Sequence, residues 1–247
     1  LEIKNIYKTF NPGTINEKVA LNGLSLKLNE GDFVTVIGGN GAGKSTMLNA
    51  VAGVWPVDEG QIIIDGTDVT KLSEYKRAAY LGRVFQDPMT GTAATMGIEE
   101  NLALAKRRGK TRLLRPGITK AERAEYKELL KILNLGLEDR LTSKVGLLSG
   151  GQRQALTLLM ATLQKPKLLL LDEHTAALDP KTAAKVLDIT DKIVNRDHLT
   201  TLMITHNMKD AIAHGNRLIM MMNGKIVLDI QGEEKKKLTF RKKTCIS

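Results

Sequence analysis

A glycine-rich loop between a predicted strand and a predicted helix constrains the fold of this sequence more than any other feature. Residues 33–37 are mostly apolar and predict a buried strand, and a helix is expected from about Lys44. The segment between them fits the pattern GxxxxGK[ST], whose backbone N–H groups turn toward a phosphate at the start of the following helix. This order predicts an α/β fold with a nucleotide site formed by Gly38, Gly39, Asn40, Gly41, Ala42, Gly43, Lys44, Ser45 and Thr46.

Two residues of this loop have distinct expected roles. The Lys44 ammonium would neutralise the β and γ phosphates, and the Ser45 hydroxyl would bind Mg²⁺. A flexible glycine turn is the structural alternative, but the flanking strand and helix favour phosphate binding.

A second motif, residues 168–173, reads LLLLDE. A short and wholly apolar run is typical of a parallel strand that is covered on both faces, and ligands of open α/β sheets gather at the carboxyl ends of such strands. Asp172 therefore suits the Mg²⁺ shell, and Glu173 could orient or deprotonate an attacking water. A solvated turn is the alternative for this pair of carboxylates.

The segment Leu148-Ser149-Gly150-Gly151-Gln152 predicts a second phosphate-binding helix start. Ser149 can cap a helix that ends before Pro166, and a capped helix start favours an anion. Asp179 and Pro180 predict the start of another helix, with Asp179 at the cap.

Three single residues have both a functional and a structural interpretation. His206 follows the predicted strand 201–205 and could reach a γ phosphate, although a lone histidine at a strand end is more often structural. Gln86 could bind Mg²⁺ or the attacking water, or could be polar surface. Phe10 could stack on adenine, with Tyr7 as the second choice and core packing as the alternative for both.

The remaining pattern alternates short strands and helices. Strands are expected at residues 1–6, 19–28, 61–65 and 167–171, and a hairpin at 217–222 and 225–230 turns at Asn223-Gly224. Residues 87–163 are mostly helical in pattern and predict an inserted helical lobe.

Composition limits the class of protein. The 247 residues and 42% hydrophobic content suit one large globular domain, and no apolar run approaches the roughly 18 residues that cross a bilayer. We therefore expect a soluble chain, and its single cysteine, Cys245, fits a reducing compartment. The net charge of +10 allows nucleotide, nucleic acid or membrane partners. The basic clusters 106–115 and 235–243 are expected to be solvated, with membrane-surface contact as the alternative.

Taken together, the motifs resemble those of the nucleotide-binding subunit of ABC transporters over nearly the whole chain. The loop at Gly38–Ser45 matches the family's Walker A, and residues 168–173 match its Walker B. Gln86 matches the Q-loop, Leu148–Gln152 the signature, residues 177–179 the D-loop with Asp179, and His206 the switch histidine. His174 and Gly39 depart from the residues usual at their positions, but neither change removes a catalytic group.

The resemblance implies a P-loop NTPase (RecA-like) α/β core with an N-terminal antiparallel β subdomain and an inserted α-helical subdomain. Residues 1–247 would form one ABC ATPase domain, with 1–86 and 164–247 as core and β subdomain and 87–163 as the helical subdomain. It also implies a homodimer that sandwiches two ATP molecules, with Mg²⁺ and with Ser149, Gly150, Gly151 and Gln152 of one copy on the ATP of the other. Glu173 would act as the base, with Lys44, Gln86 and His206 assisting.

The resemblance further implies an integral membrane permease as partner and a separate solute-binding protein, at the cytoplasmic face of a bacterial membrane. The segments around Gln86 and His174 are similar to those of importers for aromatic amino acids such as tryptophan or tyrosine, or for related small solutes. The alternative is a soluble ABC-type ATPase that acts on nucleic acid or ribosomes. The short segment between Lys44 and Ser149 and the single set of motifs argue against it, so no nucleic-acid partner is expected.

Overall fold

The structure, a computed structural model, describes residues 1–109 and 117–244, with side chains through Leu238. The chain divides into two compact units. Unit 1 contains residues 1–81, 167–173 and 198–247, and unit 2 contains residues 82–166 and 174–197. The predicted helical segment 87–163 lies wholly within unit 2, which also takes in residues 82–86, 164–166 and 174–197.

Unit 1 contains an antiparallel sheet with the strand order β2-β1-β4-β5. Its strands are β1 (Glu2–Phe10), β2 (Lys18–Lys27), β4 (Glu59–Ile64) and β5 (Thr67–Asp68). The Asp65-Gly66 turn between β4 and β5 has positive φ at both residues, as a tight hairpin requires. This sheet agrees with the N-terminal antiparallel β subdomain that the resemblance implied.

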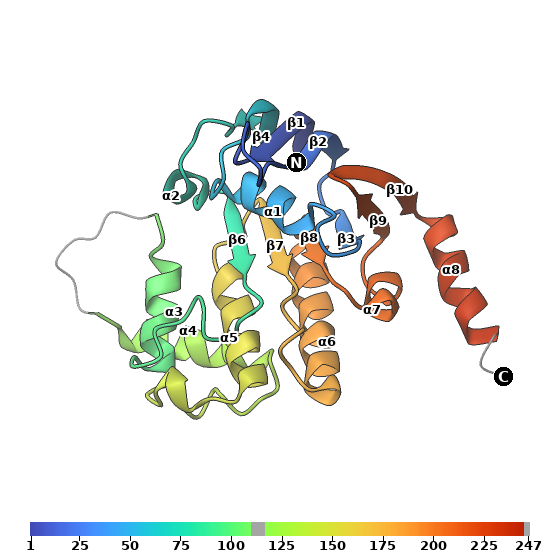
Figure 1. Cartoon of the computed structure of the whole chain (residues 1–247). Helices are drawn as coiled ribbons and strands as arrows, with labels where there is room; N and C mark the ends of the chain where they lie inside the picture. Colours follow the sequence, from blue (N-terminus) through green and yellow to red (C-terminus); the bar gives the residue numbers. More distant parts are fainter. Residues whose placement is uncertain (110–116, 245–247) are drawn as a thin grey trace. The chain divides into compact units, whose positions relative to one another are not determined.

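The second sheet of unit 1 contains, in order, β10 (Lys225–Gln231), β9 (Arg217–Met222), β3 (Phe33–Ile37), β8 (Thr201–Ile204) and β7 (Leu168–Asp172). Strands β9, β3, β8 and β7 are parallel, whereas β10 turns back through Asn223-Gly224 and is antiparallel to β9. Figure 1 shows β3, β8 and β7 side by side. Their carboxyl ends therefore lie at one edge of the sheet. Strand β6 (Leu81–Val84) carries the chain from unit 1 into unit 2.

Helix α1 (Lys44–Ala52) is the central helix of unit 1. Its Met47, Leu48 and Val51 are fully buried in one apolar cluster with strands of both sheets. The helix is thereby fixed between the sheet that carries the glycine loop and the antiparallel sheet.

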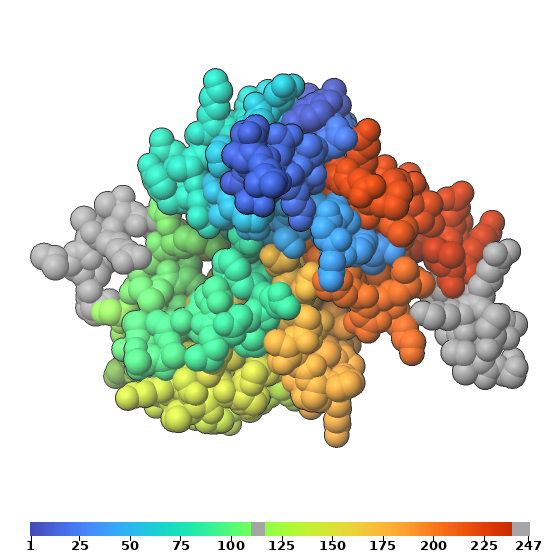
Figure 2. Space-filling model, in the orientation of Figure 1, coloured from blue at the N-terminus to red at the C-terminus, as the bar shows by residue number. Residues whose placement is uncertain are grey.

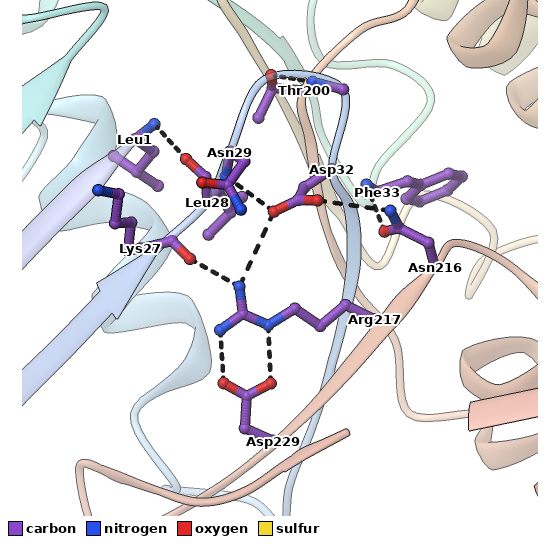
Figure 3. Close-up of polar contacts among 11 residues, drawn as sticks. Leu1, Lys27, Leu28, Asn29, Asp32, Phe33, Thr200, Asn216, Arg217 and Asp229 are labelled. Atoms are coloured by element: carbon purple, nitrogen blue, oxygen red, sulfur yellow. Dashed lines mark hydrogen bonds and ion pairs between the residues drawn. The ribbon is translucent and has the colours of Figure 1, made fainter. Parts of the chain in front are cut away.

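A polar network fixes the place where β3 begins (Figure 3). Arg217 of β9 donates to both carboxylate oxygens of Asp229 on β10, at 2.7 and 2.5 Å, and to the carbonyl of Lys27 at 2.7 Å. Asn216 accepts the Phe33 N–H at 2.9 Å. These bonds join β2, β3, β9 and β10, and Figure 2 shows the amino-terminal strands, in blue, beside the orange hairpin.

The basic tail differs from its expected state. Residues 233–244 form helix α8 (Glu233–Thr244), and Lys235 is only 3% exposed. Its ammonium donates to the carbonyls of His214 and Gly215, which directly follow helix α7 (Met208–Ala213). The prediction of a solvated terminus is therefore wrong for Lys235, because this ammonium satisfies carbonyls at a helix end. Cys245 and residues 110–115 of the other basic cluster lie outside the described residues.

Unit 2 is helical, with α3 (Ile98–Lys106), α4 (Lys120–Lys131), α5 (Gly150–Thr162), α6 (Pro180–Asp197) and the short 3₁₀ turn Val145–Leu147. Thr119 and Ser149 cap α4 and α5 in capping boxes, and Asp179 accepts a hydrogen bond from the Thr182 N–H at the start of α6. The predicted caps at Ser149 and Asp179 are confirmed. Short helix α2 (Glu74–Arg77) belongs to unit 1. In the described part of the chain, no helix is both long and apolar enough to span a membrane.

Candidate functional site

Three parallel strands of unit 1 bring three of the four predicted catalytic residues, Lys44, Glu173 and His206, to one edge of their sheet. The glycine loop follows β3, Asp172 ends β7 with Glu173 directly after it, and His206 follows β8. The register pairs Val36 of β3 and Asp172 of β7 with the same residue of β8, Ile204. The three chain segments therefore leave the sheet at the same level, where α/β proteins bind ligands.

The glycine loop has a backbone path that side chains would obstruct. Gly43 adopts φ +99°, and a Cβ there would lie 2.6 Å from the carbonyl oxygen of Ala20. A Cβ on Gly38 would overlap the carbonyl oxygen of Met221. By contrast, a Cβ on Gly39 would meet nothing within 4 Å. Only some of the predicted glycines are therefore required by the fold of the loop.

Lys44 is buried at the start of α1, with 5% of its surface exposed. Its ammonium donates to the carbonyls of Gly38 at 2.8 Å and Gly39 at 3.1 Å, so the side chain is held against its own loop. Burial lowers the pKa of Lys44, and the nearby carboxylates of Glu173 and Asp172 oppose this shift. The site therefore places one cation beside two carboxylates.

Glu173 and His206 contact each other directly. The His206 Nε2 lies 2.6 Å from Glu173 Oε1. Glu173 adopts a left-handed backbone conformation, φ +48°, which is uncommon for a residue other than glycine, and its N–H donates to the Ile204 carbonyl at 3.1 Å. The strained backbone at Glu173 thus comes directly after the last strand pairing of β7 and fixes the position of the Glu173 carboxylate.

A cavity of about 300 Å³ lies over these residues. Its lining includes the loop from Asn40 to Thr46, together with Glu173, His206 and Phe10. Asp172 lies outside the lining, although its charge acts on Lys44. Tyr7, the second choice for the aromatic residue, also lies outside the lining, and its hydroxyl occupies the space beside Gly23.

Three lining residues, Lys18, Ala20 and Trp55, were missed in the sequence. Lys18 pairs with Phe10 in the hairpin of β1 and β2, and Trp55 follows the end of α1. The hairpin pairing of residues 10 and 18 could have suggested Lys18. No sequence signal places Trp55 beside Phe10.

The signature residues lie in unit 2, at the first turn of α5. Ser149 Oγ accepts from the Gln152 N–H at 3.3 Å, and Gln152 Oε1 accepts from the Ser149 N–H at 3.1 Å. Ser149 and Gly150 are exposed, whereas Gly151 is buried. The serine-capped helix start expected from the sequence is therefore present.

The other predicted residues of unit 2 lie in separate places. Gln86 is exposed and follows Phe85, whose carbonyl accepts from the buried Gln154 side chain at 2.8 Å. Asp179 is exposed, and its hydrogen bonds from Thr182 lower its pKa. His174 is 1% exposed and its Nε2 lies 3.1 Å from Thr190 Oγ1 on α6, so its contacts are those of a core residue.

The oxygen donors near the loop suit Mg²⁺. Unit 1 offers the exposed Ser45 hydroxyl and the Asp172 carboxylate, and Mg²⁺ commonly binds one or two protein oxygens together with substrate phosphates and water. Among the described residues, no cluster of three or more His, Cys, Asp or Glu could hold a metal by itself. The donor set therefore fits an ion that binds together with a nucleotide.

Comparison with known proteins agrees with this geometry. Residues 21–176 match the family model described as "ABC transporter". The chain is 48% identical over 245 residues to the tyrosine transport ATP-binding protein of Clostridioides difficile, covering 97% of this chain and 95% of the relative. It is 34% identical to the methionine import ATP-binding protein MetN of Bartonella henselae, covering 92% of this chain but only 63% of that longer relative.

Solved structures have the same fold. One is a dimeric ATP-binding cassette in a post-hydrolysis state bound to ADP and Pi, which is 30% identical with a TM-score of 0.78 and covers 93% of this chain and 97% of its own. Another is a nucleotide-free cassette from an ABC transporter, 27% identical with a TM-score of 0.77, covering 97% of this chain and 94% of its own. The predicted P-loop NTPase class is confirmed, and the nucleic-acid alternative receives no support from these relatives.

Proposed function

This chain belongs to the ABC transporter family as an ATP-binding and ATP-hydrolysing subunit, and we propose that two copies of it sandwich two ATP molecules and drive a separate membrane permease. The observation that carries the proposal is the 48% identity to a transport ATP-binding protein over 97% of this chain. The dimeric state of a related cassette supports the sandwich. A subunit that works through a permease would act at the cytoplasmic face of a bacterial membrane.

Within each copy, the residues around the loop would divide the work of hydrolysis. Glu173 accepts a proton from the attacking water or orients it, and His206 donates to the γ phosphate. Lys44 exchanges its hydrogen bonds with the loop carbonyls for phosphate oxygens and stabilises the charge that develops there. The 2.6 Å contact between Glu173 and His206 supports a shared position near the reacting phosphate.

The remaining assignments concern ligands. Ser45, Asp172 and Gln86 would hold Mg²⁺, which neutralises charge on the β and γ phosphates when it is bound. Phe10 would stack on adenine. Residues 149–152, together with Asp179, would serve the ATP held by the other copy, where helix starts favour an anion.

The solute proposed is an amino acid, with tyrosine or tryptophan first. The relative with 48% identity is named for tyrosine transport, and more distant relatives are named for import of methionine. An importer of this kind would also use a separate solute-binding protein.

A Glu173→Gln variant tests the catalytic proposal. The amide keeps the shape of the side chain but cannot accept the proton, so ATP binding should persist while turnover falls by about 10²- to 10⁴-fold. Light scattering after gel filtration with MgATP should show a trapped dimer. Near-normal ATPase activity would exclude Glu173 as the base, and a monomer with bound ATP would exclude the sandwich.

Uptake measurements test the solute separately. Deletion of the gene in its own cell should reduce uptake of labelled tyrosine or tryptophan, and the wild-type chain should restore it while Glu173→Gln should not. Unchanged uptake of both amino acids, with an active purified ATPase, would refute the solute and leave the ATPase assignment intact.

A further inference from the structure

Trp55 occupies an unexpected place in the nucleotide cavity. It lines the cavity together with Phe10, although the two residues come from separate elements, β1 and the segment after α1. The ring centroids lie 5.0 Å apart with an interplanar angle of 82°, an edge-to-face arrangement. Such a pair leaves ring faces free, so a flat ligand stacked on one ring has the other ring at its edge.

The position of Trp55 is fixed by the end of α1. Gly53 ends the helix with φ +84°, and the N–H groups of Val54 and Trp55 then turn back to the Asn49 carbonyl at 3.0 and 3.4 Å. Helix α1 has nine residues, so its ends are about 13 Å apart at the usual rise per residue. Trp55 therefore follows the end of α1 opposite the phosphate loop.

The position of Phe10 is fixed by a polar clamp. The Lys8 ammonium lies 5.7 Å from the Phe10 ring centroid and donates to Asp58 at 2.8 Å. Asp58 also accepts the Thr9 N–H at 2.6 Å. Because Asp58 is three residues after Trp55, the clamp joins the end of β1 to the segment that carries Trp55. The two rings are thus held together before any ligand arrives.

We propose that Trp55 is a specificity-determining residue that, with Phe10, makes the cavity prefer a purine nucleotide over a pyrimidine nucleotide. The inference rests on the proposed function, in which this cavity binds ATP. A purine has the larger flat face and reaches both rings when its phosphates lie on the loop. A pyrimidine on the same loop loses most of the contact with the second ring.

Base preference tests this role directly. Trp55→Leu should raise the Kd for MgATP about three- to tenfold, which corresponds to the loss of one aromatic contact, while the Kd for MgCTP should change less than about twofold. The ATP/CTP preference should therefore fall. Trp55→Phe should keep most of the preference. Tyr75→Leu is the matched control, because Tyr75 is 75% exposed and lies outside the cavity lining.

Fluorescence provides a second measurement that needs no variant. Trp55 is the single tryptophan of the sequence, so the emission of the wild-type chain reports on this ring alone. MgATP should shift the emission in a saturable way, whereas tripolyphosphate, which lacks a base, should compete for the loop without that shift. An equal shift with tripolyphosphate would overturn the proposal, because Trp55 would then report on the phosphate loop.

The failure of this inference differs from the failure of the proposed function. A wild-type chain that binds no MgATP would refute both. A wild-type chain that binds MgATP, with a Trp55→Leu variant of unchanged ATP and CTP affinities, would refute the role of Trp55 alone. If Trp55→Leu does not fold, a wild-type emission that stays unshifted when MgATP binds would refute that role as well.

Discussion

Helices α1 and α5 both begin at glycine-rich turns, but the two helix starts are capped differently. Gly43 caps α1 in a left-handed conformation and provides no side-chain hydrogen bond. Ser149 caps α5 in an extended conformation, and its side chain and that of Gln152 bond to each other's N–H groups. The first turn of α1 thus keeps its N–H groups for an anion, whereas α5 satisfies part of its own first turn.

The glycines of the two turns also meet different neighbours. In the loop before α1, a Cβ on Gly38 or Gly43 would meet backbone carbonyl oxygens. In α5, a Cβ on Gly151 would overlap the Thr182 methyl group of α6, and one on Gly150 would approach a methyl group of Leu178 at 3.2 Å. A second substitution can remove the side-chain methyl groups that face Gly150 and Gly151, but it cannot remove the backbone oxygens that face Gly38 and Gly43. The two turns should therefore respond differently to compensating changes.

The largest expected effect concerns whether the two turns form one site between two copies. Lys44→Ala removes the phosphate cation, and Ser149→Arg blocks the other helix start, so each variant alone should lose at least about 100-fold in ATPase activity. Mixing the two variants should restore activity, because a mixed dimer contains one intact pair of turns. ATPase rates across a series of mixing ratios provide the measurement.

The control for the mixing experiment is the double variant with both substitutions in one chain. Mixed with wild type, it gives dimers in which neither pair of turns is intact, so it should only dilute activity. If mixed dimers of the two single variants are demonstrated by light scattering and remain inactive, then the sites are not shared between copies.

The next effect separates the required glycines of the loop from a permissive one. Gly43→Ala meets the Ala20 carbonyl oxygen and a left-handed backbone, so MgATP affinity and ATPase activity should fall by about 100-fold. Gly39→Ala is the matched control, because its Cβ meets nothing within 4 Å. Isothermal calorimetry measures the MgATP affinity of both variants. Equal losses at both positions would show that the loop tolerates no side chain at all.

A smaller effect is expected at Gly151, together with its repair. Gly151→Ala should push α5 away from α6 and lower ATPase activity about tenfold, because stiff Thr182 cannot move its methyl group freely. Adding Thr182→Ser removes that methyl group and should restore most of the activity and the melting temperature. Thr182→Ser alone is the control and should behave almost as wild type. No repair in the double variant would mean that the glycine serves the ligand rather than the packing.

The same contrast shows how far the sequence predicts this molecule. Strand 33–37, the Asn223-Gly224 hairpin and the caps at Ser149 and Asp179 follow from local patterns, and the structure contains all of them. Local patterns also suggested the residues of the cavity that follow strand ends, because parallel strands bring such residues to one edge.

Long-range contacts account for what the sequence did not predict. Trp55 reaches Phe10 only because the chain turns back at Gly53, and Lys235 is buried because the end of α7 offers it carbonyls. His174 marked a departure from the family pattern, but the structure buries it against Thr190. A lone tryptophan, lysine or histidine has no periodicity that would indicate which distant element it meets.

The smallest effect sharpens the comparison most, because it separates capping from phosphate binding at Ser149. Ser149→Ala removes the side-chain cap and should cost about 1 kcal/mol in the free energy of unfolding, measured by urea titration. Ser149→Asp keeps a capping oxygen and should retain that stability, because aspartate is as good a cap as serine. Its negative charge would nevertheless repel a phosphate, so the ATPase activity of Ser149→Asp should fall below that of Ser149→Ala. If both variants lose stability and activity in proportion, Ser149 acts only as a cap. The start of α5 would then differ from that of α1 in having no phosphate-binding role, as well as in having a side-chain cap.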